Sequence, residues 1–287
     1  MWVFLSFLSA FSSSGKFIIG KISSVKTDEY TSAFALQFFA LILLLPFVVF
    51  SGIPKLQNSY WLSLFGLAIT VPSWSILYIK AVKLSPLSVC VPMLAFNPIF
   101  TALLSIFFDK RLPDALGWFS IFLITIGIYL SRIDNNVLKK GLAYPILSIK
   151  QEPGTLAMFL VALIWSIGAH FSKMSAAGSS PLFFAFSSAF IGSSVLYFIF
   201  NKKINISVNN FTKNFTHLTS LGISNGLGEL TFGAALSLGY TPYVVAIVRS
   251  SILWSSLAGI LFFKETFTQI KILGLLLMFA GVILLIL

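Results

Sequence analysis

The chain has 287 residues, of which 57% are hydrophobic and only 9% are charged, whereas a soluble domain carries about 25% charged residues. Its mean hydropathy is +0.97, so a soluble fold could not bury this much apolar surface. The net charge of +11 comes from lysines between the apolar runs, a pattern typical of loops at anionic lipid headgroups. Composition therefore predicts an integral membrane protein that binds lipids and no nucleic acid.

Ten apolar runs follow one another along the chain. A helix needs about 20 apolar residues to cross the hydrocarbon core, and these runs lack the alternation of barrel strands. We therefore predict an all-α integral membrane protein with ten transmembrane helices. Pro92 and Pro98 should bend the fourth, which also contains the lone cysteine, Cys90. The predicted spans are 2–22, 31–51, 60–82, 84–108, 114–131, 154–175, 181–200, 216–239, 241–263 and 267–287.

The spans form two sets of five related by an offset of 154 residues. At this offset Gly127 matches Gly281, and Lys16 matches His170. Because five is odd, the second set must enter the bilayer from the opposite side. We predict two inverted five-helix repeats, 1–131 and 154–287, joined by a polar linker at 132–153, and such repeats are typical of secondary transporters.

The basic residues are distributed unevenly between the two sides of the predicted membrane. Loops on the side of both termini hold Lys55, Lys110, Arg111 and Lys173. The opposite loops hold twelve basic residues, and cytoplasmic loops are the basic ones, so this distribution places both termini outside the cytoplasm. The twelve are Lys21, Lys26, Lys80, Lys83, Arg132, Lys139, Lys140, Lys150, Lys202, Lys203, Lys213 and Lys264.

Two stretches at equivalent positions carry a family resemblance. They begin YIKAVKLSPLSVC in the first half and FGAALSLGYTPYV in the second, and each continues through a long apolar span, a short charged turn and a span with a late glycine. Over its whole length the chain resembles the EamA-like transporters of the drug/metabolite transporter superfamily. It keeps the glutamate of the charged turn as Glu265 in the second half but has Arg111 in the first.

The resemblance implies a pseudosymmetric basket around a central cavity. Spans 1, 3, 4, 6, 8 and 9 would line this cavity, and spans 5 and 10 would pack at the periphery. It also implies cytoplasmic termini, against the distribution of basic residues, so the orientation stays open.

Two charged residues lie at membrane depth. Glu229 precedes the turn at Tyr240 by 11 residues and Arg249 follows it by 9, so both should lie roughly 14–16 Å from that turn. A charge at this depth costs roughly 2.5–3.5 kcal/mol on insertion scales. Either the two neutralise each other as an ion pair, or they face the cavity, with Arg249 binding a substrate carboxylate and Glu229 an amine or a proton.

Further polar and aromatic residues are candidates for the cavity lining. Lys16 either snorkels to the interface or lines the cavity, and His170 is either a hydrogen-bonded helix residue or a titrating group in the lining. Trp74, Trp165 and Trp254 are deep, and they are either packing residues or a flat wall that could hold a cation. Tyr78 and Asn97 could add hydrogen bonds.

These features predict a secondary transporter in the cell membrane of a bacterium, the inner membrane. We expect it to act as a monomer on a small polar organic metabolite, an amino acid or a related amine-bearing solute, with protons as the candidate coupling ion. Quaternary ammonium and nucleoside-containing metabolites are the alternatives. A lipid-modifying enzyme would need paired acids or histidines at the interface, and an assembly protein would show no saturable flux. No catalytic, cofactor or metal-binding motif is present, so we expect no enzyme activity.

Overall fold

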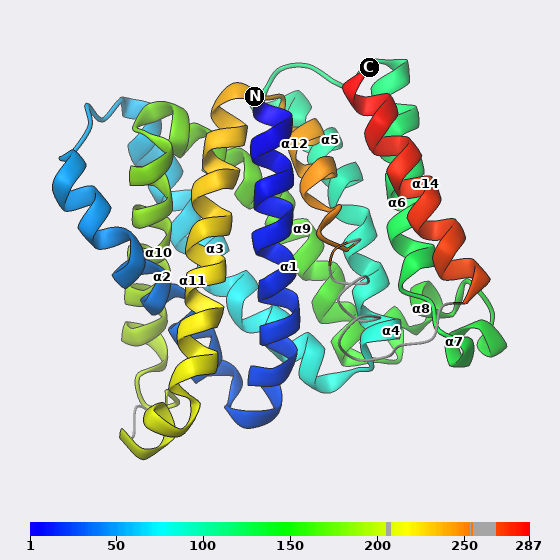
Figure 1. Cartoon of the computed structure of the whole chain (residues 1–287), viewed down its shortest axis with the longest axis horizontal. Coiled ribbons are helices and arrows are strands. Elements are labelled where there is room, and N and C mark those ends of the chain that lie inside the picture. Colours follow the sequence, from blue (N-terminus) through cyan, green and yellow to red (C-terminus); the bar gives the residue numbers. More distant parts are fainter. Residues whose placement is uncertain (205–207, 253, 255–267) are drawn as a thin grey trace.

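The computed structural model describes residues 1–204, 208–252, 254 and 268–287; for residues 17, 18, 20–26, 87 and 208–213 it describes the backbone alone. Every element in these ranges is a helix (Figure 1). Their bounds are α1 Trp2–Lys26, α2 Glu29–Ser51, α3 Asn58–Leu84, α4 Leu87–Cys90, η1 Val91–Phe96, α5 Asn97–Phe108, α6 Ala115–Ser131, α7 Asn135–Lys140, α8 Tyr144–Leu147, η2 Ser148–Lys150, α9 Pro153–Gly178, α10 Pro181–Phe200, α11 Val208–Leu238, α12 Thr241–Val248 and α14 Gln269–Ile286.

Membrane-spanning character is shared by most of the long helices. Within the described ranges six helical segments are long and apolar enough to cross a bilayer: α2, α3, the segment Ser88–Phe108, α9, α10 and α14. Helix α6 is apolar but shorter. The chain is thus an all-helical membrane protein, and the count of ten spans stays a prediction.

Short polar side chains begin several of these helices. The carboxylate of Asp28 accepts a hydrogen bond from the backbone N–H of Thr31 at the start of α2, and Asp114 accepts one from Gly117 at the start of α6. Such capping satisfies backbone N–H groups that have no partner inside the helix. Gly52 follows α2 with a φ of 74°, a conformation that favours glycine. Local sequence therefore determines where these helices begin and end.

The fourth predicted span is broken, as its prolines suggested. The chain runs from the short helix α4 into the 3₁₀ segment η1, which contains Pro92, and then into α5, which has Pro98 in its first turn. A proline removes a backbone donor and opposes a continuous α-helix. The break places Asn97 at the start of α5, in the interior of the bundle.

Two polar stretches contain more helix than expected. The linker 132–153 forms α7, α8 and η2, because Asp134 caps α7 through the N–H of Val137, and Pro145 lies in the first turn of α8. Helix α11 begins at Val208, eight residues before the predicted span at 216. The helical turns of the linker arise because short caps and proline starts can form such turns without an apolar run.

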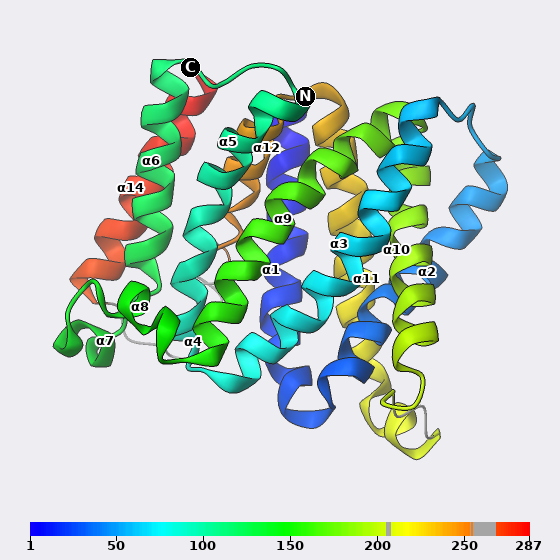
Figure 2. The same cartoon turned by 180° about the vertical axis from the view of Figure 1, so that it is seen from behind.

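Helices from the two halves pack against each other along the bundle. Helix α3 packs along α9, α1 along α11, and α6 along α14. Gly154, at the start of α9, approaches Ala81 near the end of α3, whereas Gly178 at the other end approaches Tyr60. Helices α3 and α9 are therefore antiparallel. The two termini lie at one edge of the bundle, and α6 and α14 lie together on its flank (Figures 1 and 2).

The largest buried cluster lies beside α3 and α9. Trp74, Tyr78, Met93 and Met158 are its core, with Trp165 packed against it. These apolar groups fill the space around the bend in the fourth span.

Candidate functional site

A cavity of about 730 Å³, counting its open part, lies between the two halves. Helices α1 and α3 line it from the first half, and α9, α10, α11 and the α12 region line it from the second. Helix α10 contributes Ser188, whereas no described residue of the fourth span, which the resemblance placed in the lining, lines the cavity. The polar lining residues are Ser9, Ser13, Lys16, Thr70, Ser172, Ser188, Glu229 and Arg249.

Arg249 follows α12 and is held by an amide. Its Nε donates a hydrogen bond to Oδ1 of Asn97 at 2.8 Å. Nδ2 of Asn97 donates to the Ala162 carbonyl at 3.0 Å and to Oγ of Ser166 at 2.8 Å, so the carbonyl end of this amide must face the guanidinium. Arg249 also lies over the Trp165 ring, with Cζ 4.5 Å from the ring centroid. Asn97 therefore orients Arg249 without neutralising it.

Lys16 lies opposite, on α1, and is also held by an amide. It is only 8% exposed, so it is buried rather than snorkelling to the interface. Its Nζ donates to Oδ1 of Asn225 at 3.2 Å and lies 5.2 Å from the Trp74 centroid and 5.9 Å from the Trp165 centroid. The indole of Trp165 therefore has two cations near it, Lys16 and Arg249.

Glu229, on α11, is the one acidic residue among the described residues that line the cavity. In the described ranges it forms no ion pair within 4.0 Å, with Arg249 or with any other base. The geometry of this structure is thus that of two charges lining one cavity rather than that of the mutual ion pair.

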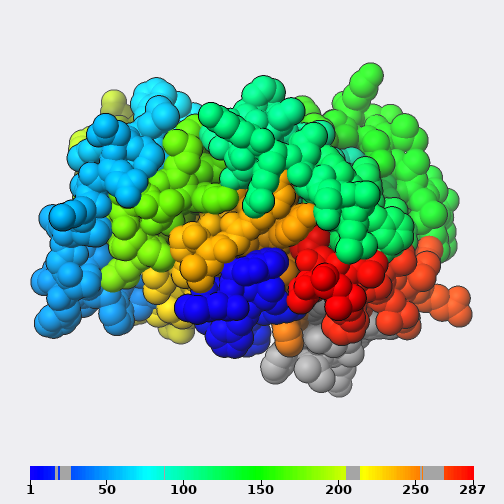
Figure 3. Space-filling model, turned by 90° about the horizontal axis from the view of Figure 1, so that it is seen from above, coloured from blue at the N-terminus to red at the C-terminus, as the bar shows by residue number. Residues whose placement is uncertain are grey.

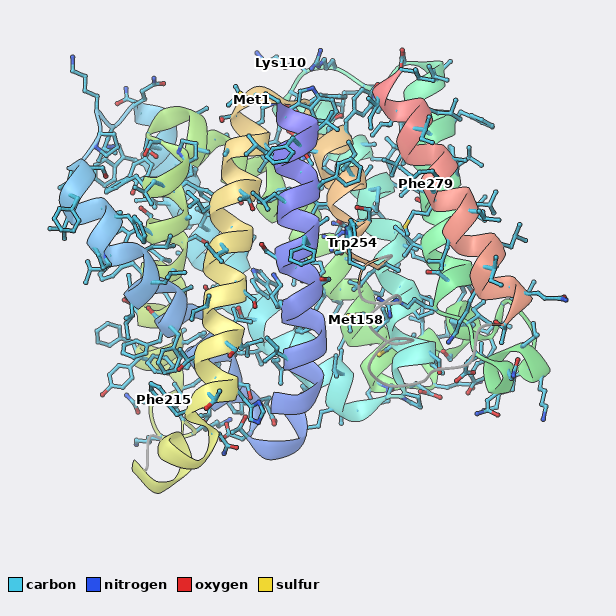
Figure 4. All side chains as sticks on the ribbon, viewed as in Figure 1. Met1, Lys110, Met158, Phe215, Trp254 and Phe279 are labelled. Carbon is cyan, nitrogen blue, oxygen red and sulfur yellow. The ribbon has the colours of Figure 1, made fainter. Side chains whose placement is uncertain are left out.

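The predicted aromatic residues divide into two groups. Trp74 and Trp165 meet edge to face, with centroids 5.5 Å apart, and both line the cavity. Tyr78 stacks on Trp165 from the core side and is not in the lining. Trp254 is 40% exposed and contacts Phe11 on α1 (Figure 4). The structure therefore brings together Lys16, Trp74, Trp165, Glu229 and Arg249, with Asn97 and Tyr78 behind them, and leaves Trp254 apart.

His170 lies outside the lining, in a charged cluster at the end of α5. The cluster consists of Asp109, His170 and Lys173. Lys173 Nζ lies 2.7 Å from Asp109 Oδ1, His170 Nδ1 lies 3.4 Å from Asp109 Oδ2, and His170 Nε2 bonds the Thr101 carbonyl at 3.1 Å. Burial acts to raise the pKa of the Asp109 carboxyl, but the contacts with His170 and Lys173 outweigh it and hold that pKa at about 2. The cluster joins the first half to α9 through charge.

This cluster belongs to a band of polar contacts on the face that carries the termini. The Tyr240 hydroxyl donates to the Arg111 carbonyl at 2.8 Å, and the Tyr243 hydroxyl donates to Asp114 at 2.9 Å. The segment after α5 lies beside the start of α12 on this face (Figure 3), and Lys110 lies at the same edge as Met1 (Figure 4).

Sequence reasoning missed the polar residues that support Lys16. Asn225 Nδ2 donates to Gln37 Oε1 at 3.5 Å, and Gln37 Nε2 donates to Ser75 Oγ at 3.0 Å. Gln37 and Asn225 are each 1% exposed. An amide at the centre of an apolar span is itself a signal, because polar groups at this depth are costly and need partners.

Within the described residues, no group of three or more His, Cys, Asp or Glu side chains could hold a metal ion. The chemistry of the cavity is that of charge, amide and indole groups, which suits reversible binding of an organic solute.

Comparison with known proteins identifies the family and the fold of the chain. No curated protein matches it. One protein crystal structure superposes with a TM-score of 0.73 at 14% identity, covering 99% of this chain and 95% of that one, which shows a shared fold. The family model for the EamA-like transporter family matches residues 1–133 and again 152–287. The chain therefore belongs to the EamA-like transporter family, and it is a membrane transporter of the drug/metabolite transporter type.

Proposed function

We propose that this transporter carries an amino acid or a related amine-bearing solute, and that the cavity between the halves is its binding site. The single observation that carries this proposal is the composition of one cavity: two cations and one carboxylate line it beside two indole rings. Arg249 and Lys16 can bind a carboxylate, and Glu229 can bind an ammonium group. Trp74 and Trp165 offer an apolar wall for the rest of the solute.

Transport would occur by alternating access, with one repeat rocking against the other around the site. The repeats would be 1–131 and 154–287. Two observations support their inverted relation. Gly239 at the end of α11 approaches Trp2 at the start of α1, and Gly15 approaches Ser224, so α1 is antiparallel to α11. Because one helix, α10, separates α9 from α11, α9 runs in the direction of α11, and the first helices of the two halves therefore run in opposite directions. Gly127 and Gly281, at equivalent positions, each lie where α6 and α14 cross.

Quaternary ammonium solutes are the second candidate, because indole faces bind such cations. Here Lys16 and Arg249 already lie over these rings, so a permanent cation would have to displace a like charge. We therefore place the amine-bearing carboxylate first. Proton coupling would require Glu229 to change its charge during the transport cycle.

We propose the bacterial inner membrane as the location of this transporter.

Reconstitution tests the site. Purified protein in proteoliposomes is assayed for saturable uptake of a panel of radiolabelled amino acids, with Glu229→Gln and Arg249→Ala as site variants. We expect each to reduce uptake at least about tenfold, the effect of losing about 1.4 kcal/mol of solute binding. Glu29→Gln is the matched control, because Glu29 pairs with Lys83 away from the cavity. Wild-type uptake by both site variants would show that the solute binds elsewhere.

A further inference from the structure

The charges of the cavity do not balance. Among the described residues that line it, Lys16 and Arg249 are basic and Glu229 alone is acidic. Each cation is held by an uncharged amide, Asn225 or Asn97, rather than by a carboxylate. With all three groups ionised, the lining therefore carries one excess positive charge.

Such an excess is costly where the surroundings are apolar. Charges at membrane depth need compensation, and a buried charge without a counter-charge destabilises the protein that holds it. The amides that hold Lys16 and Arg249 supply dipoles but no net charge. A solute that brings a second carboxylate would supply the missing counter-charge, whereas a neutral zwitterion would leave it unmet.

The two cations also occupy separate positions. Lys16 extends from α1 over Trp74 and Trp165, and Arg249 lies on Trp165 from the α12 side. The cations thus offer two carboxylate-binding positions at different places around one indole. A single carboxylate would engage one of them and leave the other without an anion.

We propose that the cavity selects a solute with two carboxylates and one ammonium group, an amino dicarboxylate. One carboxylate binds Arg249, the other binds Lys16, and the ammonium group binds Glu229. This inference rests on the proposed function, because it names the substrate class of the same site. Lys16 is then the residue that determines specificity, since it supplies the charge that a neutral amino acid does not match.

The test compares two solutes of nearly equal shape. L-Glutamate and L-glutamine differ by one carboxylate, and glutarate has both carboxylates but no ammonium group. Their dissociation constants are measured on the purified full-length protein by competition with radiolabelled L-glutamate. We expect glutamate to bind at least about tenfold more tightly than glutamine, and glutarate to bind more weakly than glutamate because the Glu229 carboxylate repels it.

Variants assign the preference to Lys16. Lys16→Met removes the charge but keeps a long side chain, so it should abolish the preference for glutamate, whereas Lys16→Arg should retain it. Lys83→Met is the control, because this lysine is exposed and remote from the cavity. The solute comparison on the wild-type protein stands even where Lys16→Met fails to fold.

The outcomes separate the two proposals. If glutamine binds as tightly as glutamate, or neutral amino acids are carried and glutamate is not, the amino dicarboxylate assignment is overturned while amino-acid transport stands. If glutarate binds as tightly as glutamate, the ammonium-binding role of Glu229 is overturned. If none of twenty amino acids is bound or carried, the proposed function itself fails.

Discussion

The sequence brought Glu229 and Arg249 together as candidates, but it did not predict the partners of either residue. Spacing from the turn at Tyr240 placed Glu229 and Arg249 at similar depth, and both line the cavity. The partner of Arg249 is Asn97, 152 positions away. Apolar helices in lipid have no polar face that fixes their rotation, so the sequence could not determine which side chains meet. For the same reason the sequence could not show that Trp254, one of the expected cavity residues, lies against Phe11.

At this scale, Asp109 has a testable pH dependence. Its pKa is about 2 in the folded protein, against an ordinary value of 3.8. A depressed folded pKa stabilises the protein fully above 3.8, and this contribution is lost as the pH falls from 3.8 toward 2. Because the pair with Lys173 is partly exposed, solvent screening limits the contribution to about 1 kcal/mol.

We therefore expect Asp109→Asn to lower the melting temperature in detergent at pH 7 and to have a shrinking effect below pH 4. Lys173→Gln should show the same trend, because it removes the partner of the same carboxylate. A difference between wild type and Asp109→Asn that stays constant down to pH 3 would show that the ion pair contributes nothing to stability.

At the scale of elements, glycines and prolines were the most informative residues. Pro92 and Pro98 predicted the break in the fourth span, and that break places Asn97 where it can reach Arg249. The small residues of α1 and α11 pack against each other: Ser9 Oγ donates to the Gly228 carbonyl at 3.1 Å, and Gly15 faces Ser224. The helical turns of the linker were missed, since caps act over three residues and leave no periodic pattern.

The crossing of α6 and α14 depends on two glycines. A Cβ at Gly127 would lie 2.5 Å from the Met278 backbone nitrogen, and one at Gly281 would lie 2.9 Å from the Ser120 carbonyl oxygen. Since backbone atoms cannot move aside, Gly127→Ala and Gly281→Ala should each destabilise the protein by about 1–3 kcal/mol, the cost typical of overpacking.

Thermal unfolding in detergent measures this effect. Gly168→Ala serves as the control, because a Cβ there would meet Thr70 at an ordinary 3.6 Å. If Gly127→Ala melts together with Gly168→Ala, the two helices do not approach as closely as described.

The whole fold was the part best predicted from sequence. The all-helical class, the family and the membrane setting follow from composition and from the pattern repeated in both halves. The lining of the cavity was less predictable. Helix α10 contributes Ser188, whereas the described part of the fourth span has no lining residue and reaches the site through Asn97, which contacts Arg249. The sequence could not predict this, because the tilt of each helix is set by packing between the halves.

The position of the termini gives a prediction for the whole molecule. Both lie at one edge of the bundle (Figure 1), so cysteines added before Met1 and after Leu287 should react together with a membrane-impermeant maleimide. Cys90 is fully buried, which keeps the background low. Labelling of intact cells would support the orientation indicated by the basic loops, and labelling only after lysis would support cytoplasmic termini. Reaction of one terminus alone would exclude an even number of spans.

The position of Trp165 beside two cations has an optical consequence. Lys16 and Arg249 both lie near its ring, and the emission energy of an indole depends on the electric field across it. A solute that draws one cation away from the ring must change that field. With the other five tryptophans replaced by phenylalanine, the fluorescence emission wavelength of Trp165 would therefore report in real time whether a solute occupies the cavity, without any attached dye.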